Sequence, residues 1–499
     1  MNEMENRMTS ASLEENVQYF TETFDGSSDL VIRRMEICGV PAALITMEGL
    51  IDKLTIAQTI LNPILAFRSE VTDPVKLFDI LQRDVLAISD FKTVTDYSTA
   101  LNLLFNGFAL LLLDGCIQIL AAGTQGFQFR SISEPQNETT QSGSRESFVE
   151  PYLINMGMIR RRIRDPRLKF ERLVVGKRSN TNILLCYLRD VASDELVSSV
   201  RGKIKSMHLD TVLASGYLAP FLQKSGGFFF RSASRSERPD TVCAKIGEGR
   251  VAIIVDGTPS ALIVPHLFVE NFQSFDDYIN RPFFAFFIRM LKYLAFFIAL
   301  FMPGFYVATT AFHPELLPQP LLLKIAQSEA TTPFPAMLEV LIIHIIYEIM
   351  REAGLRVPRP LAQAVSIVSA LVIGDTAVSS GLIGAPTLMV VAITATASYV
   401  TPSLYEPVAV IRLIMIFIGG WMGFWGLMLG VFVVLVNICS ETSYGIPFSC
   451  IALQQAGNAG CVLACQLEKA RETEYEGAGH AGFQAEGFIF REVENETGC

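Results

Sequence analysis

Three ionisable residues lie close together in an apolar stretch of this 499-residue chain. Glu339, His344 and Glu348 fall within one predicted helix, and His344 and Glu348 share a face of it because they are four residues apart. Asp375 lies near the middle of the next apolar segment. Polar groups are costly in such surroundings unless they have a partner or a function, so these residues are the first candidates for a functional site.

A stripe of small or polar residues follows the predicted helix over residues 361–382. Its members are separated by steps of three or four and therefore lie on one face: Gln363, Ser366, Ala370, Gly374, Ala377 and Gly381. Close helix packing and the lining of a polar path both explain such a stripe. Asp375, beside the stripe, favours the candidate ion path.

The sequence contains few motifs for phosphate binding, metal binding or nucleophilic catalysis. The sequence has no phosphate-binding G-x-x-x-x-G-K-[ST] motif and no G-x-S-x-G motif, and residues 247–252 fit G-x-G-x-x-A but lead into a predicted strand. The five histidines lie far apart, and Cys461 and Cys465 are better interpreted as reduced thiols than as metal ligands. We therefore expect no enzymatic activity, no cofactor and no metal.

The composition predicts a soluble region joined to an integral membrane region. Hydrophobic residues make up 50% of the chain and charged residues 18%, below the ~25% that is typical of soluble proteins. Only seven Lys/Arg and seven Asp/Glu occur between Phe283 and Ser440. The net charge of −10 argues against a nucleic-acid binder. Residues 1–29 carry no signal-peptide pattern, so we place the soluble region in the cytoplasm.

The membrane region contains about five predicted helices. Candidate spans are residues 290–312, 335–350, 361–382, 386–400 and 408–439. We expect the last to be one long tilted helix, and a break at Gly419-Gly420 would give six spans instead. Basic residues near residues 281–292 and 351–359 place these segments on the cytoplasmic side and residues 313–332 outside.

The soluble region reads as two similar α/β halves. In each, a buried strand and a helix are followed by two strands joined at an Asp-Gly turn. The segments are 42–47, 49–66, 108–115 and 116–121 in one half, and 183–188, 193–207, 250–257 and 260–264 in the other. Asp114 and Asp256 of the two turns are 142 residues apart. A duplicated unit explains this order, and chance recurrence is the alternative.

A basic run follows the polar linker 131–150. Residues 160–178 contain nine Lys/Arg, opposed only by Asp165 and Glu171. Contact with membrane lipid or a partner protein is one interpretation, for which the candidates are Arg160, Arg161, Arg162 and Arg164. Ion pairs within a solvated helix face are the other. No aromatic residues alternate with the basic ones as in nucleic-acid sites.

Three segments resemble a known family. They are SISEPQNETTQSGSRESFVEPYLINMGMIRRRIRDPRLKFERL (131–173), ERPDTVCAKIGEGRVAIIVDGTPSALIVP (237–265) and PFPAMLEVLIIHIIYEIMREAGLRVPRPLAQAVSIVSALVIGDTAV (333–378). They closely resemble the A subunit of the GerA-type spore germinant receptors, over roughly residues 32–447.

The resemblance implies a subunit in the inner membrane of dormant spores that works with a transporter-like B subunit and a lipoprotein C subunit. It also implies a homo-oligomer that forms an ion path, with Gln363, Ser366, Gly374 and Asp375 in the lining segment. The sequence departs from the family at His344, often a carboxylate, and at Asp375, often a glutamine. After Pro447 an acidic tail replaces the usual Pro-rich, basic end.

We therefore predict a cytoplasmic α/β domain of two similar halves followed by a multi-span α-helical membrane domain. The expected boundaries are a disordered segment 1–30, halves at 31–130 and 151–280 around the linker 131–150, a transmembrane domain 281–440 and a poorly ordered tail 441–499. The predicted function is a non-enzymatic receptor subunit that triggers germination. The alternatives are a secondary transporter that works alone and a non-conducting membrane scaffold.

Overall fold

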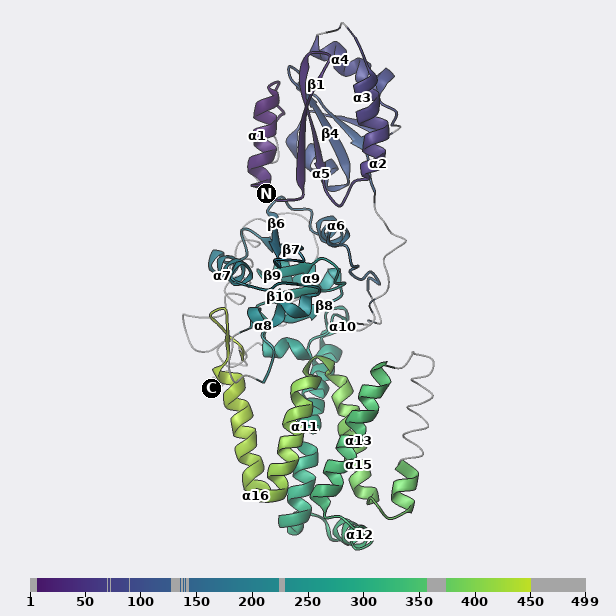
Figure 1. Cartoon of the computed structure of the whole chain (residues 1–499), viewed down its shortest axis with the longest axis vertical. Helices are drawn as coiled ribbons and strands as arrows, with labels where there is room; N and C mark the ends of the chain where they lie inside the picture. The colour runs from purple at the N-terminus through teal and green to yellow at the C-terminus, as the bar shows by residue number, and fades with distance from the viewer. Residues whose placement is uncertain are drawn as a thin grey trace, which may run out of the picture. The chain divides into compact units, whose positions relative to one another are not determined.

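The computed structural model describes residues 7–69, 71, 73–88, 90–126, 135, 138, 140, 143–223, 229–356 and 374–449. Two five-stranded sheets lie in the N-terminal part, and long helices follow (Figure 1). We call residues 7–126 the first half, residues 143–279 the second half and residues 282–440 the helical region.

The first half is built around the sheet β1-β2-β4-β5-β3, in which all neighbours are antiparallel. Buried residues of β2 alternate between two cores, one on each face of the sheet, as expected for a strand covered on both sides. Its strands are β1 (Leu30–Ile37), β2 (Val40–Met47), β3 (Phe91–Val94), β4 (Phe108–Leu113) and β5 (Ile119–Gly123). Its helices are α1 (Leu13–Phe24), α2 (Lys53–Ile56), α3 (Asn62–Ala66), α4 (Pro74–Ile80) and α5 (Tyr97–Phe105).

The second half repeats this order in the sheet β6-β7-β9-β10-β8, again antiparallel throughout. Its strands are β6 (Leu168–Val175), β7 (Thr181–Leu188), β8 (Ser234–Ser236), β9 (Val251–Val255) and β10 (Ala261–Val264). Its helices are α6 (Tyr152–Arg162), α7 (Asp194–Lys205), α8 (Ala219–Leu222), α9 (Pro239–Gly247) and α10 (Asp276–Ile279). The predicted strands fall on β2, β4, β5, β7, β9 and β10, while the outer strands β1, β3, β6 and β8 were not predicted.

Side-chain contacts repeat together with the strand order. Asn16, in the first turn of α1, accepts from the backbone N–H of Ser10 at 3.0 Å and donates to its carbonyl oxygen at 2.7 Å. Asn155, at the same position of α6, makes the same two contacts with Val149, at 2.8 and 2.6 Å. Asp114 and Asp256 of the two Asp-Gly turns accept from the first N–H of α1 and of α6. Matching contacts of this kind favour duplication over chance recurrence.

The N-terminal segment is not disordered as predicted, because residues 13–24 form α1. Leu13, Val17, Phe20 and Phe24 lie on one face of this helix and are buried in a core of the first half. Burial of this apolar face stabilises the helix. The acidic residues around this face had led us to predict disorder.

The helical region contains α11 (Pro282–Phe312), α12 (Gln319–Glu329), α13 (Ala336–Arg356), α15 (Ala385–Val400) and α16 (Tyr405–Ser440). In the part of the chain that the structure describes, two helices are long and apolar enough to cross a membrane, over residues 282–312 and 402–440. This is fewer than the five expected. Most of the predicted span 361–382 lies outside the described residues, and α15 is a shorter apolar helix.

The prediction of one long tilted helix over residues 408–439 is wrong. At Gly423 the backbone has φ 61° and ψ −146°, which ends one helix and begins another within α16. Glu406 pairs with Arg231, and Asn437 accepts from the N–H of Phe229 at 3.1 Å. Glu406 and Asn437 would be ~46 Å apart in a straight helix, so α16 must fold back on itself.

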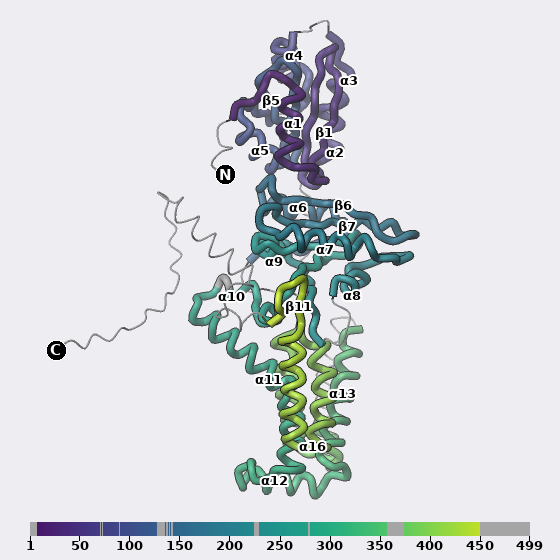
Figure 2. The backbone as a smooth tube through the Cα atoms, turned by 90° about the vertical axis from the view of Figure 1, so that its left-hand side faces the viewer, coloured from purple at the N-terminus to yellow at the C-terminus, as the bar shows by residue number. Residues whose placement is uncertain are grey.

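The chain returns to the second half after α16. Strands β11 (Thr442–Ser443) and β12 (Ile446–Pro447) form a hairpin, seen beside the second half in Figure 2. The Tyr444 hydroxyl donates to the carbonyl oxygen of Leu222 at 2.9 Å, and the N–H of Phe268 donates to the carbonyl oxygen of Phe448 at 3.0 Å. The start of the tail that we predicted to be poorly ordered is therefore structured, and residues 450–499 lie outside the described residues.

A buried carboxylate organises the connection from the second half to α11. Glu270 accepts from Lys245 at 2.9 Å, from His266 Nδ1 at 3.0 Å and from Arg250. Burial raises the pKa of Glu270, but the His266 hydrogen bond and the Arg250 charge outweigh it and hold this pKa well below its ordinary value. The segment that leads to α11 is thus held by a carboxylate that stays ionised at neutral pH.

Candidate functional site

An ion pair centred on a buried arginine joins three helices of the helical region. Arg412 of α16 is 1% exposed, and its Nη2 lies 2.6 Å from Oε1 of Glu348 on α13. Its Nη1 donates to the Ser398 hydroxyl of α15 at 3.0 Å. Tyr405 donates to Oε2 of Glu348 at 2.5 Å, and Arg351 Nε lies 3.3 Å from the same oxygen. We call these five residues the Arg412 cluster.

Several buried polar atoms in and beside the Arg412 cluster have no hydrogen-bond partner among the described residues. His344, one turn before Glu348, is 1% exposed, and neither ring nitrogen has a hydrogen-bond partner there. Arg412 Nε is also buried without a partner among the described residues. Buried donors and acceptors of this kind usually bind water or a ligand, so the region between α13 and α16 is suited to polar species.

Glu339 has a different position and a structural role. It is 1% exposed, and its Oε1 accepts from the backbone N–H of Gly384, the residue before α15. A carboxylate at a helix N-terminus is stabilised by the free N–H groups and the dipole of that helix. The three residues singled out on one predicted helix therefore divide into a helix cap, Glu339, and two members of the polar interior, His344 and Glu348.

The predicted stripe is only partly covered by the structure. Gln363, Ser366 and Ala370 lie outside the described residues, and residues 374–379 are helical. A Cβ on Gly374 would lie 3.6 Å from Leu388 of α15, and Ala377 packs against the buried cluster of Ile343, Ile383 and Val391. Asp375 is exposed in the single chain. Gly374 and Ala377 thus lie on the side of α15, whereas Asp375 is exposed.

Gly381 does not belong to the helical face on which we placed it. The helix ends at residue 379, and Gly381 has φ 68°, which glycine adopts without strain. Its i+4 spacing from Ala377 was compatible with a helix, but the turn before α15 breaks the periodicity.

The basic run is largely paired with carboxylates of the first and second halves. Arg160 is fully buried, with Nε 2.7 Å from Oδ2 of Asp29 in the first half. Arg161 and Arg162 both donate to Glu146, and these hydrogen bonds outweigh burial and lower the pKa of that carboxyl. Arg164 is exposed. Arg160 therefore joins the two halves, while lipid or partner contact by the other three arginines stays a prediction.

Sequence reasoning missed the centre of the Arg412 cluster. The signal was present, because Arg412 is the single formal charge in residues 408–439 and a charge in such a stretch needs a partner. Its partner Glu348 is 64 residues away in the sequence, so the pairing could not be assigned. Among the described residues, no group of three or more His, Cys, Asp or Glu could hold a metal ion.

Comparison with known proteins identifies relatives over most of the chain. The family model "Bacillus/Clostridium GerA spore germination protein" matches residues 18–462. "Spore germination protein KA" of Bacillus subtilis (strain 168) is 38% identical over 446 residues, covering 88% of this chain and 82% of the relative. "Uncharacterized membrane protein YfkQ" of the same organism is 34% identical over 450 residues, covering 89% and 86%.

A solved structure also matches. The N-terminal domain of the A subunit of the Bacillus megaterium spore germinant receptor GerK3 is 27% identical, with a TM-score of 0.40, covering 52% of this chain and 98% of that one. The family match spans far more than half of the sequence. The chain therefore belongs to the Bacillus/Clostridium GerA spore germination protein family.

Proposed function

We propose that this chain is the A-type subunit of a nutrient receptor in the spore inner membrane and that it forms or gates an ion-conducting path. Family membership supports the role in germination. The observation that carries the conducting role is the Arg412 cluster, in which a buried arginine, its carboxylate partner and neighbouring polar groups lie between otherwise apolar helices. Polar interiors of this kind mark ion and proton paths in membrane proteins.

The proposed assembly follows the receptor architecture that the family resemblance implies. A transporter-like B subunit would bind the nutrient, and a lipoprotein C subunit would complete the receptor. Several copies of this chain would surround the path, with Asp375 of each copy contributing to a ring of carboxylates. Such a ring would favour cations. The exposure of Asp375 in the single chain is compatible with this placement.

The contacts of the hairpin β11–β12 bear on membrane topology. The chain enters the helical region from the second half and returns to it at Tyr444 and Phe448. If the soluble region is cytoplasmic, residues 441–449 are cytoplasmic too, and the number of membrane crossings is even. We therefore replace the expected five spans by an even number. Reporters fused after Asp277 and after residue 449 should both read cytoplasmic, whereas one within residues 327–332 should read external.

The conducting role is tested with Asp375→Asn, which keeps the size of the side chain and removes its charge. We expect normal assembly with reduced cation flux or relaxed selectivity. Gly374→Leu adds bulk to the same segment and should either block cation release or cause release without nutrient. The assay is cation release from spores, or from liposomes that hold the whole receptor, normalised to assembled protein.

Glu352→Gln is the matched control, since it removes an exposed carboxylate that pairs with Arg356 outside the stripe. Unchanged flux for Asp375→Asn together with loss of assembled protein for Gly374→Leu would refute the ion path and favour a packing role. Nutrient uptake by liposomes that hold this chain alone would instead establish the stand-alone transporter.

A further inference from the structure

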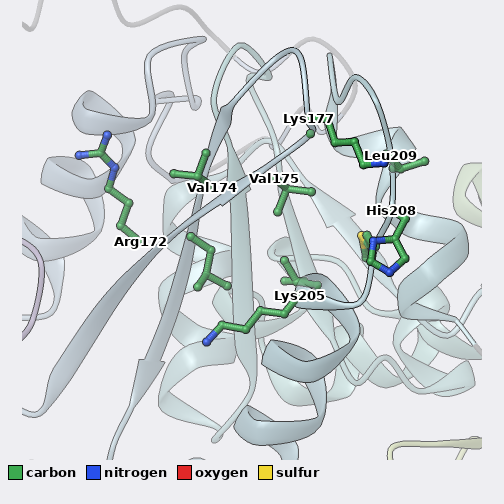
Figure 3. Close-up of a pocket in the computed structure, with 11 residues that line it drawn as sticks. Arg172, Val174, Val175, Lys177, Lys205, His208 and Leu209 are labelled. Carbon is green, nitrogen blue, oxygen red and sulfur yellow. The ribbon is translucent and has the colours of Figure 1, made fainter.

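A hollow of about 440 Å³ lies beside β6, between its C-terminal end and the segment that follows α7. Figure 3 shows Arg172 on one side of it and Lys177 and His208 on the other, with Val174 between them. Lys205 also lines it. Among the described residues that line this hollow, which we call the β6 hollow, none is Asp or Glu. Its rim is therefore basic and attracts negative charge.

The floor of the β6 hollow is apolar. Val175, Ile204 and Met207 are buried beneath it, while Val174 remains 56% exposed. An exposed valine on a strand surrounded by basic residues offers a contact for an apolar side chain. A ligand that carries only charge, such as inorganic phosphate, would leave this surface uncovered.

The outer edge of β6 is partly occupied. β6 pairs with β7 on one side and stands at the edge of its sheet. On its other side, Phe170 accepts from the N–H of Ser28 at 2.9 Å, and its own N–H donates to the Ser27 hydroxyl at 3.1 Å. The first half thus covers this edge at Phe170.

The next positions along the same edge are open. Backbone groups in an antiparallel strand point alternately to its two sides, so the N–H and C=O groups of Arg172 and Val174 point the same way as those of Phe170. No described residue bonds to these groups across the edge. The N–H of Lys177 donates to the carbonyl oxygen of Leu209 at 3.1 Å, which closes the edge again. The open stretch therefore accommodates a short extended segment.

We propose that β6 binds an extended, acidic segment of a partner protein, which adds as a short strand along Arg172–Val174. Backbone hydrogen bonds to the open edge would hold the segment, its carboxylates would face Lys177, Lys205 and His208, and an apolar side chain would cover Val174. Strand addition at an open edge next to a side-chain pocket is an established mode of peptide recognition. The basic rim selects acidic over basic segments by charge complementarity.

This interaction lies outside the helical region and does not depend on ion conduction. It is tested on the full-length chain in detergent micelles by fluorescence anisotropy. The probe is a fluorescein-labelled peptide, Glu-Val-Glu-Val-Glu-Val, and the comparison peptide is Lys-Val-Lys-Val-Lys-Val. We expect saturable binding of the acidic peptide that weakens with added salt, and at least tenfold weaker binding of the basic one.

Two variants separate the charge of the rim from the backbone of the edge. Lys177→Glu with Lys205→Glu should weaken binding of the acidic peptide at least tenfold, whereas Arg33→Glu with Lys92→Glu, two exposed cations of the first half, should leave it unchanged. Val174→Pro removes an N–H that points away from β7, so the sheet should persist. Loss of that hydrogen bond should weaken binding about fivefold.

Each outcome decides the proposal. Equal binding of both peptides, or no binding of either, overturns it. If charge reversal weakens binding and Val174→Pro does not, the acidic segment does not add as a strand, and the proposal also fails. Val174→Pro should have the same melting temperature as the wild type, which shows that weaker binding is not caused by unfolding. Val174→Thr keeps the backbone N–H and should retain at least half of the affinity for the acidic peptide.

Discussion

Removing Arg160 should open the joint between the first half and the second half. Its guanidinium and the Asp29 carboxylate are both fully buried, with Nε and Oδ2 2.7 Å apart. It also donates to the carbonyl oxygens of Asp165 and Leu168, each at 2.8 Å. In Arg160→Met, Asp29 is left as a buried charge without its counter-charge, and two carbonyls lose their donor.

Breaking a buried ion pair from one side costs about 3–5 kcal/mol. If that energy holds the halves together, the free energy of opening the joint falls by the same amount. Amide exchange through this opening should then accelerate roughly 150- to 4,500-fold, since each factor of ten corresponds to about 1.4 kcal/mol. The reporters are the N–H groups of Ser28 and Phe170, which bond across the joint.

The assay is hydrogen–deuterium exchange by mass spectrometry on the full-length chain in detergent. Arg161→Met is the matched control, because Arg161 belongs to the same basic run but its side chain is 21% exposed where it pairs with Glu146. Partly exposed pairs contribute at most about 1 kcal/mol, so exchange should change by about fivefold or less. Adding Asp29→Leu to Arg160→Met removes the unpaired charge and should restore most of the protection against amide exchange. The carbonyl oxygens of Asp165 and Leu168 still lack their donor, so the free energy of opening should stay lower by about 1 kcal/mol for each.

Equal acceleration in Arg160→Met and Arg161→Met would refute this reasoning. So would unchanged protection at Ser28, since the buried pair would then contribute nothing to the joint. Either result would instead favour the other interpretation of the basic run, in which its arginines form ion pairs on a solvated helix face.

Three further predictions concern other parts of the chain. Gly423→Ala should lower the stability of the chain in detergent by about 1–3 kcal/mol, measured by thermal unfolding. The backbone at φ 61° and ψ −146° suits only glycine, and the added Cβ would lie 3.0 Å from Phe312. Gly354→Ala is the control and should be neutral or stabilising, because the space at its Cβ is open. Arg412→Met should reduce the yield of folded protein only modestly, because Glu348 is 23% exposed and keeps Tyr405 and Arg351 as partners, so the pair contributes about 1 kcal/mol. Combining it with Glu348→Leu should keep that yield but not cation release. Glu270→Gln should lower the melting temperature at neutral pH. Because the pKa of Glu270 is lowered on folding, its contribution is present above the unfolded pKa of about 4.3 and is lost as the pH falls further. The melting temperatures of the variant and the wild type should therefore converge in acid.

Local sequence signals were sufficient for the inner strands. The apolar runs of β2, β4, β7 and β9 and the Asp-Gly turns after β4 and β9 are decided by neighbouring residues, and their positions were predicted. The outer strands β1 and β6 were missed because they carry several charges, such as Arg33 and Glu36, on an edge exposed to solvent. A polar edge strand resembles a loop until its pairing partner is known.

The sequence by itself determined which residue types are costly to bury, the repeat spacing of 142 residues and the division into a charged N-terminal region and an apolar region. Tertiary structure alone decided how the buried charges are neutralised, since Arg160 pairs with a residue 131 positions away and Arg412 with one 64 positions away. It also decided that α16 folds back at Gly423, because the local pattern allowed either one long helix or a break at Gly419-Gly420 and did not choose between them. Hydrophobicity and turn propensity act between near neighbours and can be read along a chain, whereas the partner of a buried charge depends on which distant segments the fold brings together.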